Sequence, residues 1–360
     1  MTRPVRACID LSALQHNLSL ARQAAPDSRI MAVIKANAYG HGAVPVARAL
    51  KRADAFAVAS IDEAVLLREA DVQRPLLLLQ GVFSADELEA AANYDLQVAV
   101  HVREQIDWLE QSRINAPLHV WLKVDTGMHR LGVPADYVAT ALDRLQELVA
   151  RRGGSIRLMS HLACADIPDH PANDAQLAVF RTLPERGFER SLANSAALLT
   201  RSDMCFDWVR PGIMLYGASP FDVGVENPAN LRAAMNFESE LIAVHARKQG
   251  ESIGYGQTWK CPVDMPVGVV AAGYGDGYPR HAPAGMPVLV NGKIVPLIGR
   301  VSMDTLYVDL RNQPEAVAGG SVQLWGSCLP AEAVAARAGT ISYELFCNVS
   351  PRVPREYVNG

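Results

Sequence analysis

Lys35 is the residue of this sequence whose type and position most favour covalent chemistry. It ends the apolar run Met31–Ile34 and precedes small residues and glycines in the segment VIKANAYGHG. A lysine that is half buried at the end of a strand has a lowered pKa and can form a Schiff base. The following glycines let a ligand approach the backbone closely. A solvated lysine at a strand end is the alternative interpretation.

Other polar residues follow similar apolar runs. Ser195 and the backbone N–H groups of Gly212-Ile213 come after two such runs and could bind a phosphate. A phosphate site together with a Schiff-base lysine predicts pyridoxal phosphate as cofactor. Arg210, just before the glycine, would then donate a hydrogen bond to the pyridine nitrogen without protonating it. That contact weakens the cofactor as an electron sink and favours removal and return of a proton over transamination. Without a cofactor, Arg210 would be a structural ion-pair partner.

The elements that must position these residues alternate between short apolar strands and helices. We expect eight strands in the first two thirds of the chain: Ile30–Lys35, Ala55–Ser60, Pro75–Gln80, Leu96–His101, Leu118–Val124, Ile156–His161, Arg190–Asn194 and Trp208–Met214. Eight strand–helix units predict an α/β fold with an N-terminal (β/α)8 barrel of the TIM type, whose active site lies at the carboxyl ends of the strands. An open doubly wound sheet is the alternative, but no GxGxxG follows the first strand.

Two helices of the barrel carry the signature of a capping box, in which a Ser precedes a Glu by three residues. Ser60 and Glu63 open the helix expected over Asp62–Ala70, and Ser84 and Glu87 open the one expected over Ser84–Asn93. A third helix is expected over Pro134–Arg151.

The pattern changes after Leu231, where strands follow one another with few helices. The β-like runs are Glu238–Ala246, Val267–Ala272, Met286–Val290, Lys293–Ile298, Thr305–Leu310 and Ser321–Trp325, and one helix is expected over Pro330–Ala338. Asn291-Gly292 between two alternating runs predicts a hairpin. We therefore expect a barrel over residues 1–231 and a mainly antiparallel β-domain over 232–360, with the strand Arg6–Asp10 joining the second domain.

Composition excludes several classes of protein. With 49% hydrophobic residues and a formal net charge of −4, the 360-residue chain can build a large core, and no dense basic run suggests nucleic acid as a partner. No apolar run reaches the 18 or more residues of a membrane helix, and the start, MTRPVRACIDLS, has no apolar core of the length that a signal peptide needs, so we expect neither segment. The six cysteines form no CxxC pair, which argues against a zinc site or a disulfide framework and for a cytoplasmic location.

The chain resembles the bacterial alanine racemases over essentially its whole length. VIKANAYGHG is similar to the family's cofactor-lysine signature. The further segments that resemble family motifs, in the family's order, are WLKVDTGMHRLG, the SH after the sixth strand, ANSAA, VRPGIMLYG, GYGQTW, GYGDGYPRHA, GRVSMD, ISYELFC and RVPR. One departure is Gly275, where the family commonly has alanine. The resemblance implies interconversion of L- and D-alanine, which supplies D-alanine for peptidoglycan or serves alanine catabolism.

The resemblance implies two catalytic bases. Lys35 would hold pyridoxal phosphate and act on one face of the substrate, and Tyr255 of the β-domain would act on the other. Racemisation needs this pairing, because a single base would tend to return the proton to the same face. Tyrosine has a reference pKa of about 10, and His161 and Arg210 would form a chain toward it that tunes the hydroxyl.

The resemblance also implies roles for residues around the two bases. The implied phosphate ligands are Tyr39, Ser195, Gly212, Ile213 and Tyr343, with Asn194 at the cofactor rim. The implied substrate contacts are Arg130, which also meets the cofactor's phenolic oxygen, the N–H of Met303, and Asp304 beside it. Lys123 is similar to a lysine that is carbamylated in many members, which would orient Arg130. The implied substrate corridor comprises Tyr274, Asp166, Arg280 and Arg300, although surface ion pairing is an alternative for the last three.

The same resemblance implies a homodimer with shared active sites and the two chains head to tail. The residues that would come from the partner subunit are Tyr255, Tyr274, Met303 and Asp304.

Three alternative functions fit parts of the sequence. A racemase of the same family could act on serine or basic amino acids. A pyridoxal-dependent decarboxylase would carry EPGR-like and CES-like motifs, which are absent. A barrel that only carries pyridoxal phosphate would lack the β-domain and Tyr255.

Overall fold

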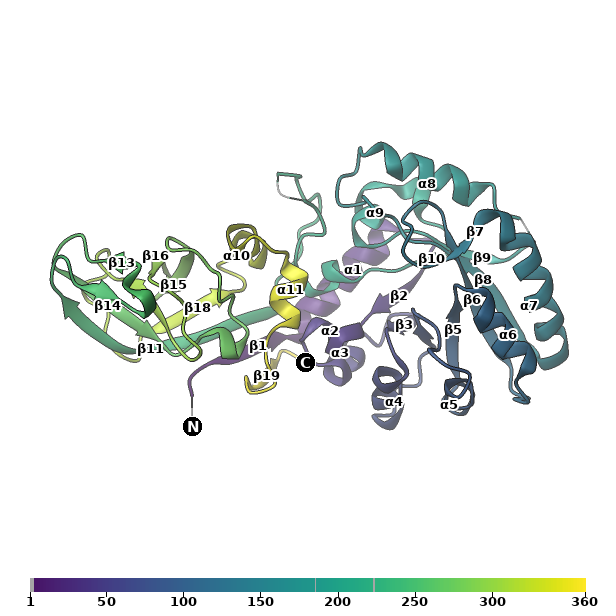
Figure 1. The fold of residues 1–360 in the computed structure, drawn as a ribbon, viewed down its shortest axis with the longest axis horizontal. Coiled ribbons are helices and arrows are strands. Elements are labelled where there is room, and N and C mark those ends of the chain that lie inside the picture. The colour runs from purple at the N-terminus through teal and green to yellow at the C-terminus, as the bar shows by residue number, and fades with distance from the viewer. Residues whose placement is uncertain (1–2, 185, 223) are drawn as a thin grey trace.

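The computed structural model describes residues 3–184, 186–222 and 224–360 of the chain. Figure 1 shows two lobes joined side by side, with the barrel at one end of the molecule and the β-domain at the other. No helix in the described ranges is long and apolar enough to cross a membrane.

The first lobe is the expected (β/α)8 barrel. Its strands are parallel and run in the order β5-β4-β3-β2-β10-β9-β8-β6, and the pairing of β5 with β6 closes the circle. Their bounds are Arg29–Val33 (β2), Ala55–Val58 (β3), Leu76–Leu78 (β4), Leu96–Val100 (β5), Leu118–Asp125 (β6), Gly154–Met159 (β8), Glu189–Ser191 (β9) and Trp208–Val209 (β10). A short strand β7 (Val133–Pro134) adds to the edge of β6. All eight expected strands are present, and the fold class is confirmed.

The last barrel strand is shorter than expected. It ends at Val209, and the segment Ile213–Tyr216 forms a 3₁₀-helix (η3) instead of continuing the strand. Pro211 offers no N–H to a neighbouring strand, so the ladder cannot continue through it.

Helices cover the outside of the barrel (Figure 1). They are α1 (Leu11–Ala24), α3 (Ala43–Ala49), α4 (Ile61–Glu69), α5 (Glu87–Asn93), α6 (Arg103–Gln111), α7 (Val138–Arg152), α8 (Pro171–Arg181) and α9 (Ser195–Thr200). The segment α2 (Lys35–Tyr39) lies between β2 and α3 and is described with the site. Short 3₁₀ turns are η1 (Ala135–Tyr137) and η2 (Ser202–Met204).

The capping boxes expected from the sequence do not form. Ser60 precedes α4 as expected, but its side chain makes no cap bond, and the Glu63 carboxylate accepts the N–H of Ala59, one residue further back, at 2.7 Å. At α5 the helix begins at Glu87 itself, and that carboxylate accepts the N–H of Phe83 at 2.9 Å. In both places the acidic side chain reaches past the helix start to an N–H of the preceding loop.

The second lobe is built on one eight-stranded sheet, in the order β14-β17-β16-β15-β18-β11-β1-β19. The bounds are Arg6–Asp10 (β1), Met235–Arg247 (β11), Met265–Val270 (β14), Pro287–Val290 (β15), Lys293–Ile298 (β16), Leu306–Asp309 (β17), Ser321–Trp325 (β18) and Arg355–Val358 (β19). All pairs are antiparallel except β1 with β19, and β11 also pairs with β14. The antiparallel β class expected for this part is confirmed.

Smaller elements complete the second lobe. They are β12 (Ser252–Ile253), η4 (Tyr255–Gln257), β13 (Trp259–Lys260), η5 (Tyr274–Asp276), α10 (Ala331–Ala338) and α11 (Ser342–Cys347). The hairpin between β15 and β16 turns at Asn291 and Gly292, which have φ of 45° and 78° as a type I′ turn requires. Because β1 pairs with β11, the N-terminal strand belongs to this sheet although the next helix, α1, covers the barrel.

Candidate active site

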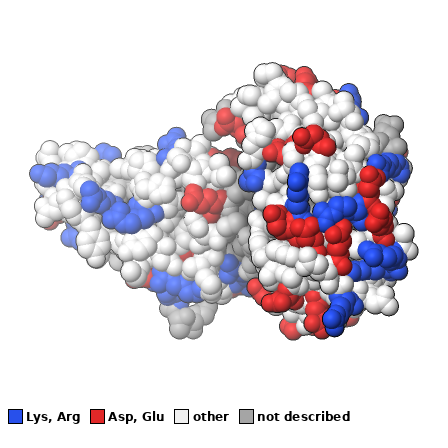
Figure 2. All heavy atoms as spheres, turned by 45° about the vertical axis from the view of Figure 1, so that its right-hand side comes forward, with Lys and Arg blue, Asp and Glu red and all other residues white. Residues whose placement is uncertain are grey.

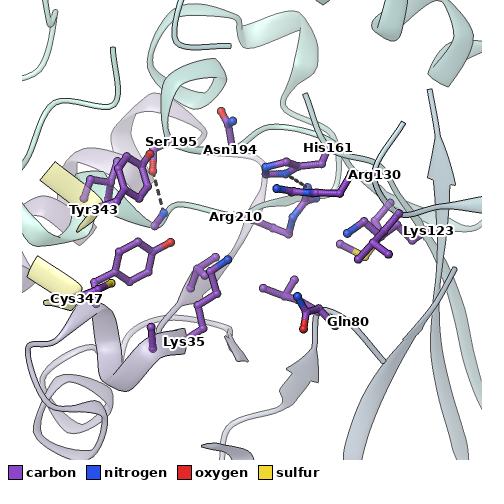
Figure 3. A pocket seen from close by; sticks show the side chains of 18 residues that line it. Lys35, Gln80, Lys123, Arg130, His161, Asn194, Ser195, Arg210, Tyr343 and Cys347 are labelled. Atoms are coloured by element: carbon purple, nitrogen blue, oxygen red, sulfur yellow. Dashed lines mark hydrogen bonds between the residues drawn. The ribbon is translucent and has the colours of Figure 1, made fainter. Parts of the chain in front are cut away.

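A left-handed turn follows the first barrel strand and aims Lys35. The residues Ala36, Asn37, Ala38 and Tyr39 have φ of 52°, 52°, 53° and 50°, so α2 is a left-handed turn made of non-glycine residues. This conformation costs about 1–2 kcal/mol per residue, and such strain persists only where surrounding contacts impose it. The bond from Gly40 N to the Ala36 oxygen (2.9 Å) closes the turn. Figure 3 shows the Lys35 amine pointing into a cavity above it.

The cavity lies at the carboxyl ends of the barrel strands and has a volume of about 650 Å³. Its lining residues are Val33, Lys35, Ala36, Tyr39, Leu79, Gln80, Lys123, Arg130, Leu131, Met159, His161, Asn194, Ser195, Arg210, Gly212, Ile213, Tyr343 and Cys347. Four of them are Lys or Arg, and none in the described part of the chain is Asp or Glu. Like charges enclosed together repel one another in a low dielectric, so this cavity favours a ligand with several negative charges.

The two lysines of the cavity both have a lowered pKa. Burial and the nearby Arg130 lower the pKa of Lys35, while the Glu63 carboxylate opposes that change. Burial, Arg210 and Arg130 lower the pKa of Lys123 to about 8. Part of the Lys123 amine population is therefore neutral near pH 8. The lowered pKa of Lys35 likewise raises the share of its neutral amine, which is the nucleophilic form.

Among the described residues, no carboxylate contacts Arg210. It is 4% exposed, and its two terminal nitrogens donate to the Ser191 hydroxyl and to the Ser160 and Leu192 carbonyls. Its Nη2 also lies 3.5 Å from His161 Nδ1 (Figure 3). Burial lowers the pKa of Arg210 to about 10, and burial together with Arg210 and Lys123 holds the pKa of His161 well below its usual value. At neutral pH a charged guanidinium therefore faces a neutral imidazole.

A cup of hydroxyl and N–H groups forms the opposite side of the cavity. The Ser195 hydroxyl accepts the N–H of Gly212 at 2.8 Å, and a side chain added at Gly212 would meet the Tyr39 hydroxyl at 2.6 Å. Burial raises the pKa of Tyr39 well above its usual value and that of Tyr343 to about 12, so both keep their protons as donors. Asn194 caps α9 by accepting two backbone N–H groups, while Ser195 bonds to the next loop.

Residues expected from the β-domain lie outside this cavity. Tyr255, Met303 and Tyr274 are 70%, 52% and 38% exposed. Their loops adjoin, since Tyr274 N donates to the Ser302 oxygen at 3.0 Å and a side chain at Gly256 would meet the Arg300 guanidinium at 3.3 Å. Within one chain, the structure does not bring Tyr255, Tyr274 or Met303 into the cavity with Lys35.

Asp304 is engaged in ion pairs rather than free. Its carboxylate contacts Arg3 at 3.2 Å and Arg352 at 2.8 Å. Both arginines also pair with Asp276, which is fully buried.

The residues expected in the substrate corridor separate into two groups. Asp166 is on the barrel and lines a second hollow of about 440 Å³, which shares His161, Asn194 and Tyr343 with the main cavity. Arg280 and Arg300 are exposed on the β-domain and line neither hollow.

Three residues at the site are not predicted as functional by the sequence pattern. Gln80 ends an expected strand in the same way as Lys35, so the strand-end rule could have found it. Cys347 lines the cavity from α11, which only the fold brings near. The capping-box spacing predicts Glu63 as a helix cap, but its second oxygen accepts the N–H of Ala36 next to Lys35.

Comparisons with known proteins show to which family this chain belongs. A family model described as "Alanine racemase, N-terminal domain" matches residues 9–220, and one described as "Alanine racemase, C-terminal domain" matches residues 234–357. The chain belongs to the alanine racemase family. The resemblance noted in the sequence is thereby confirmed.

Relatives in this family match along the whole chain. The alanine racemase of Nitrosococcus oceani is 52% identical over 97% of this chain and 98% of its own length, and that of Halorhodospira halophila is 50% identical over 100% and 99%. The crystal structure of the biosynthetic alanine racemase from Pseudomonas aeruginosa superposes with a TM-score of 0.95 at 45% identity, covering 99% of this chain and 100% of that one.

Proposed function

We propose that this cavity interconverts L- and D-alanine with bound pyridoxal phosphate, using Lys35 and a tyrosine of a second chain as its two bases. The alanine racemase activity itself follows from membership in the family. Membership also decides against the decarboxylase and the cofactor-carrying barrel, and nothing in the comparisons supports the broader-specificity alternative.

The cluster of four basic side chains, with no carboxylate among the described residues that line the cavity, carries the proposal for the cofactor. A phosphorylated, phenolic cofactor and a substrate carboxylate would together supply the negative charge that the cavity lacks. When bound, pyridoxal phosphate supplies an electron-withdrawing ring that acidifies the α-hydrogen of the amino acid. Lys35 would hold the cofactor, because it is the cavity's amine that the left-handed turn aims inward.

The other residues of the cavity would bind and orient. The phosphate would take hydrogen bonds from Tyr39, Ser195, Tyr343 and the N–H groups of Gly212 and Ile213. Arg210 stays a fixed donor, because carbonyls and a hydroxyl hold its guanidinium and it does not give up a proton.

Substrate orientation would fall to groups around the mouth of the cavity. Arg130 would bind the substrate carboxylate, and a carbamate on Lys123 would orient it. Asn194, the cap of α9, would support the cofactor rim. The corridor roles of Tyr274, Asp166, Arg280 and Arg300 belong to the same proposal.

The second base would come from a partner subunit. Tyr255, Tyr274 and Met303 form exposed apolar and aromatic surface on adjoining loops, and Figure 2 shows that much of the β-domain face in view is uncharged. Such surface indicates an interaction site. In a two-fold dimer, Lys35 would remove or return the α-proton on one face. Tyr255 of the partner subunit would do so on the other face. His161 and Arg210 would form a chain of polar groups toward that tyrosine and tune its hydroxyl.

A chiral assay with purified protein and pyridoxal phosphate tests the substrate. L-alanine should convert to an equal mixture of enantiomers, while serine, lysine and arginine convert far more slowly. Comparable rates with the basic amino acids would overturn the assignment to alanine. Borohydride reduction followed by peptide mass mapping should place the cofactor on Lys35, and a label on Lys123 instead would contradict the assigned roles.

Subunit mixing tests the shared site. Lys35→Ala and Tyr255→Phe should each be inactive alone, and an equal mixture after dissociation and reassociation should recover about a quarter of wild-type activity. Half of the dimers are then mixed, and each mixed dimer has one intact site of two. No recovery in dimers that have demonstrably exchanged subunits would refute the shared-site model.

A further inference from the structure

We propose that Glu63 is a positioning residue for Lys35. Its carboxylate holds the left-handed turn that follows the lysine and places a negative charge next to that turn. The inference rests on the proposed function of Lys35 and extends it to a residue on the outer helix α4.

The Glu63 carboxylate joins two segments that are separate in sequence. Its Oε2 accepts the N–H of Ala59 at 2.7 Å, at the end of the strand β3, and its Oε1 accepts the N–H of Ala36 at 2.6 Å. Ala36 is the first residue of the left-handed turn and the immediate neighbour of Lys35. One carboxylate therefore links the lysine turn to the adjacent strand and helix of the barrel.

The neighbouring barrel loops also have a loop N–H that donates to a side chain at the start of the next helix. The additional contact from Glu63 to Ala36 is what distinguishes this loop. Phe83 N donates to Glu87 and His101 N donates to Gln105, each acceptor lying four residues after its donor, as Glu63 does after Ala59. In the contacts of the described residues, only the Glu63 carboxylate extends this arrangement to the lysine turn. Hydrogen bonds to a charged acceptor are roughly twice as strong as neutral ones, which suits a turn whose backbone conformation is strained.

The same carboxylate acts on the charge of Lys35. The titratable groups that act electrostatically on Lys35, or on which it acts, are Arg130, Lys123 and His161 from the barrel, Cys347 from α11 and Glu63 from α4. Burial and Arg130 lower the pKa of Lys35, and Glu63 raises it. Removing the Glu63 charge should therefore lower that pKa further.

Three variants separate geometry from charge. Glu63→Gln keeps the shape but places an amide NH₂ against one of the two N–H donors and removes the charge. Glu63→Asp keeps the charge but shortens the side chain by one methylene, which moves the carboxylate away from the Ala36 N–H. Glu87→Gln is the matched control, because its carboxylate makes the equivalent loop contact without reaching the lysine turn.

The first measurement uses the protein free of cofactor. An amine-reactive reagent labels Lys35 over a range of pH, and mass spectrometry quantifies the product. Glu63→Gln should shift the labelling profile of Lys35 to lower pH, while Glu87→Gln and Glu63→Asp should leave it close to wild type. The second measurement is the rate of pyridoxal phosphate release, which should rise at least about tenfold in both Glu63 variants and stay unchanged in Glu87→Gln.

The proposal is overturned if Glu63→Gln alters only the melting temperature, or if Glu87→Gln changes labelling and release to the same extent. If Glu63→Gln does not fold, Glu63→Asp decides alone. For Glu63→Asp, faster release of pyridoxal phosphate together with a wild-type labelling profile supports the proposal. Release of pyridoxal phosphate at the wild-type rate refutes it. Reductive trapping of the wild-type protein separates this test from the proposed function. Absence of cofactor on Lys35 would end that function, whereas the labelling comparison would still test Glu63.

Discussion

Asp276→Asn should weaken the β-domain loops that we assign to the partner's active site. Asp276 is fully buried and accepts three hydrogen bonds, from Arg3 Nη2 and Arg352 Nε, both at 2.8 Å, and from Gly273 N at 2.9 Å. Arg352 also donates to the Met303 oxygen at 3.2 Å, so the cluster ties the η5 loop to the loop of Met303. Asparagine retains one oxygen and turns an NH₂ toward a guanidinium.

The magnitude follows from the two charge-assisted bonds. Each is worth about 1.5–3 kcal/mol when the charged groups are well buried. The side chains of Arg3 and Arg352 are 35% and 39% exposed, so water screens part of this. We expect a loss of about 2–3 kcal/mol in the free energy of unfolding and a melting temperature lower by about 4–12 °C. If about half of that free energy also positions the Met303 N–H, KM for alanine should rise roughly tenfold.

Denaturant unfolding and the kinetics of racemisation in both directions measure these effects. Asp309→Asn is the matched control, because Asp309 is also nearly buried in the β-domain and pairs with Arg311, away from these loops. It should lower stability with KM unchanged. A stability loss below about 0.5 kcal/mol in Asp276→Asn would refute the energetic reasoning. A full stability loss with unchanged KM would refute the link to substrate binding.

Three further predictions concern the barrel. Lys35→Ala should lose the visible absorbance of the bound cofactor and racemise alanine at least about a thousandfold more slowly, and retained activity would exclude Lys35 as a base. Tyr216→Phe should cost about 1 kcal/mol, because the Tyr216 hydroxyl donates to the Val33 oxygen at 2.9 Å in a fully buried site. Chemical denaturation measures that loss, and a neutral substitution would contradict the contact. Lys123 has a pKa lowered to about 8 in the fold, so the unfolded chain binds more protons between about pH 8 and its ordinary pKa of about 10.5. Wild type should therefore gain stability relative to Lys123→Met as pH rises through this window in CO₂-free buffer, and a constant difference would contradict the lowered pKa.

Local pattern was enough to predict the barrel and the β-domain class. Short apolar runs alternating with helices specify a parallel sheet covered by helices. The Asn291-Gly292 dipeptide has the backbone freedom that a tight hairpin needs. The same logic placed Lys35 at a strand end, where a barrel collects its functional groups. These features depend on residues close together in the chain, which is why the sequence alone carries them.

Contacts between distant segments decided the rest. The left-handed turn after Lys35 is unfavourable for its own residues and exists only because the surrounding structure holds it. The capping-box pattern predicted the wrong partner for Glu63, because a carboxylate bonds to whichever N–H the fold brings near, and here that is Ala36 from another loop. The cavity's excess of positive charge likewise arises only when separate strands bring Arg210 and Lys123 to one rim. Spacing along the chain says which residues can do chemistry, and tertiary structure determines which of them share an electrostatic environment.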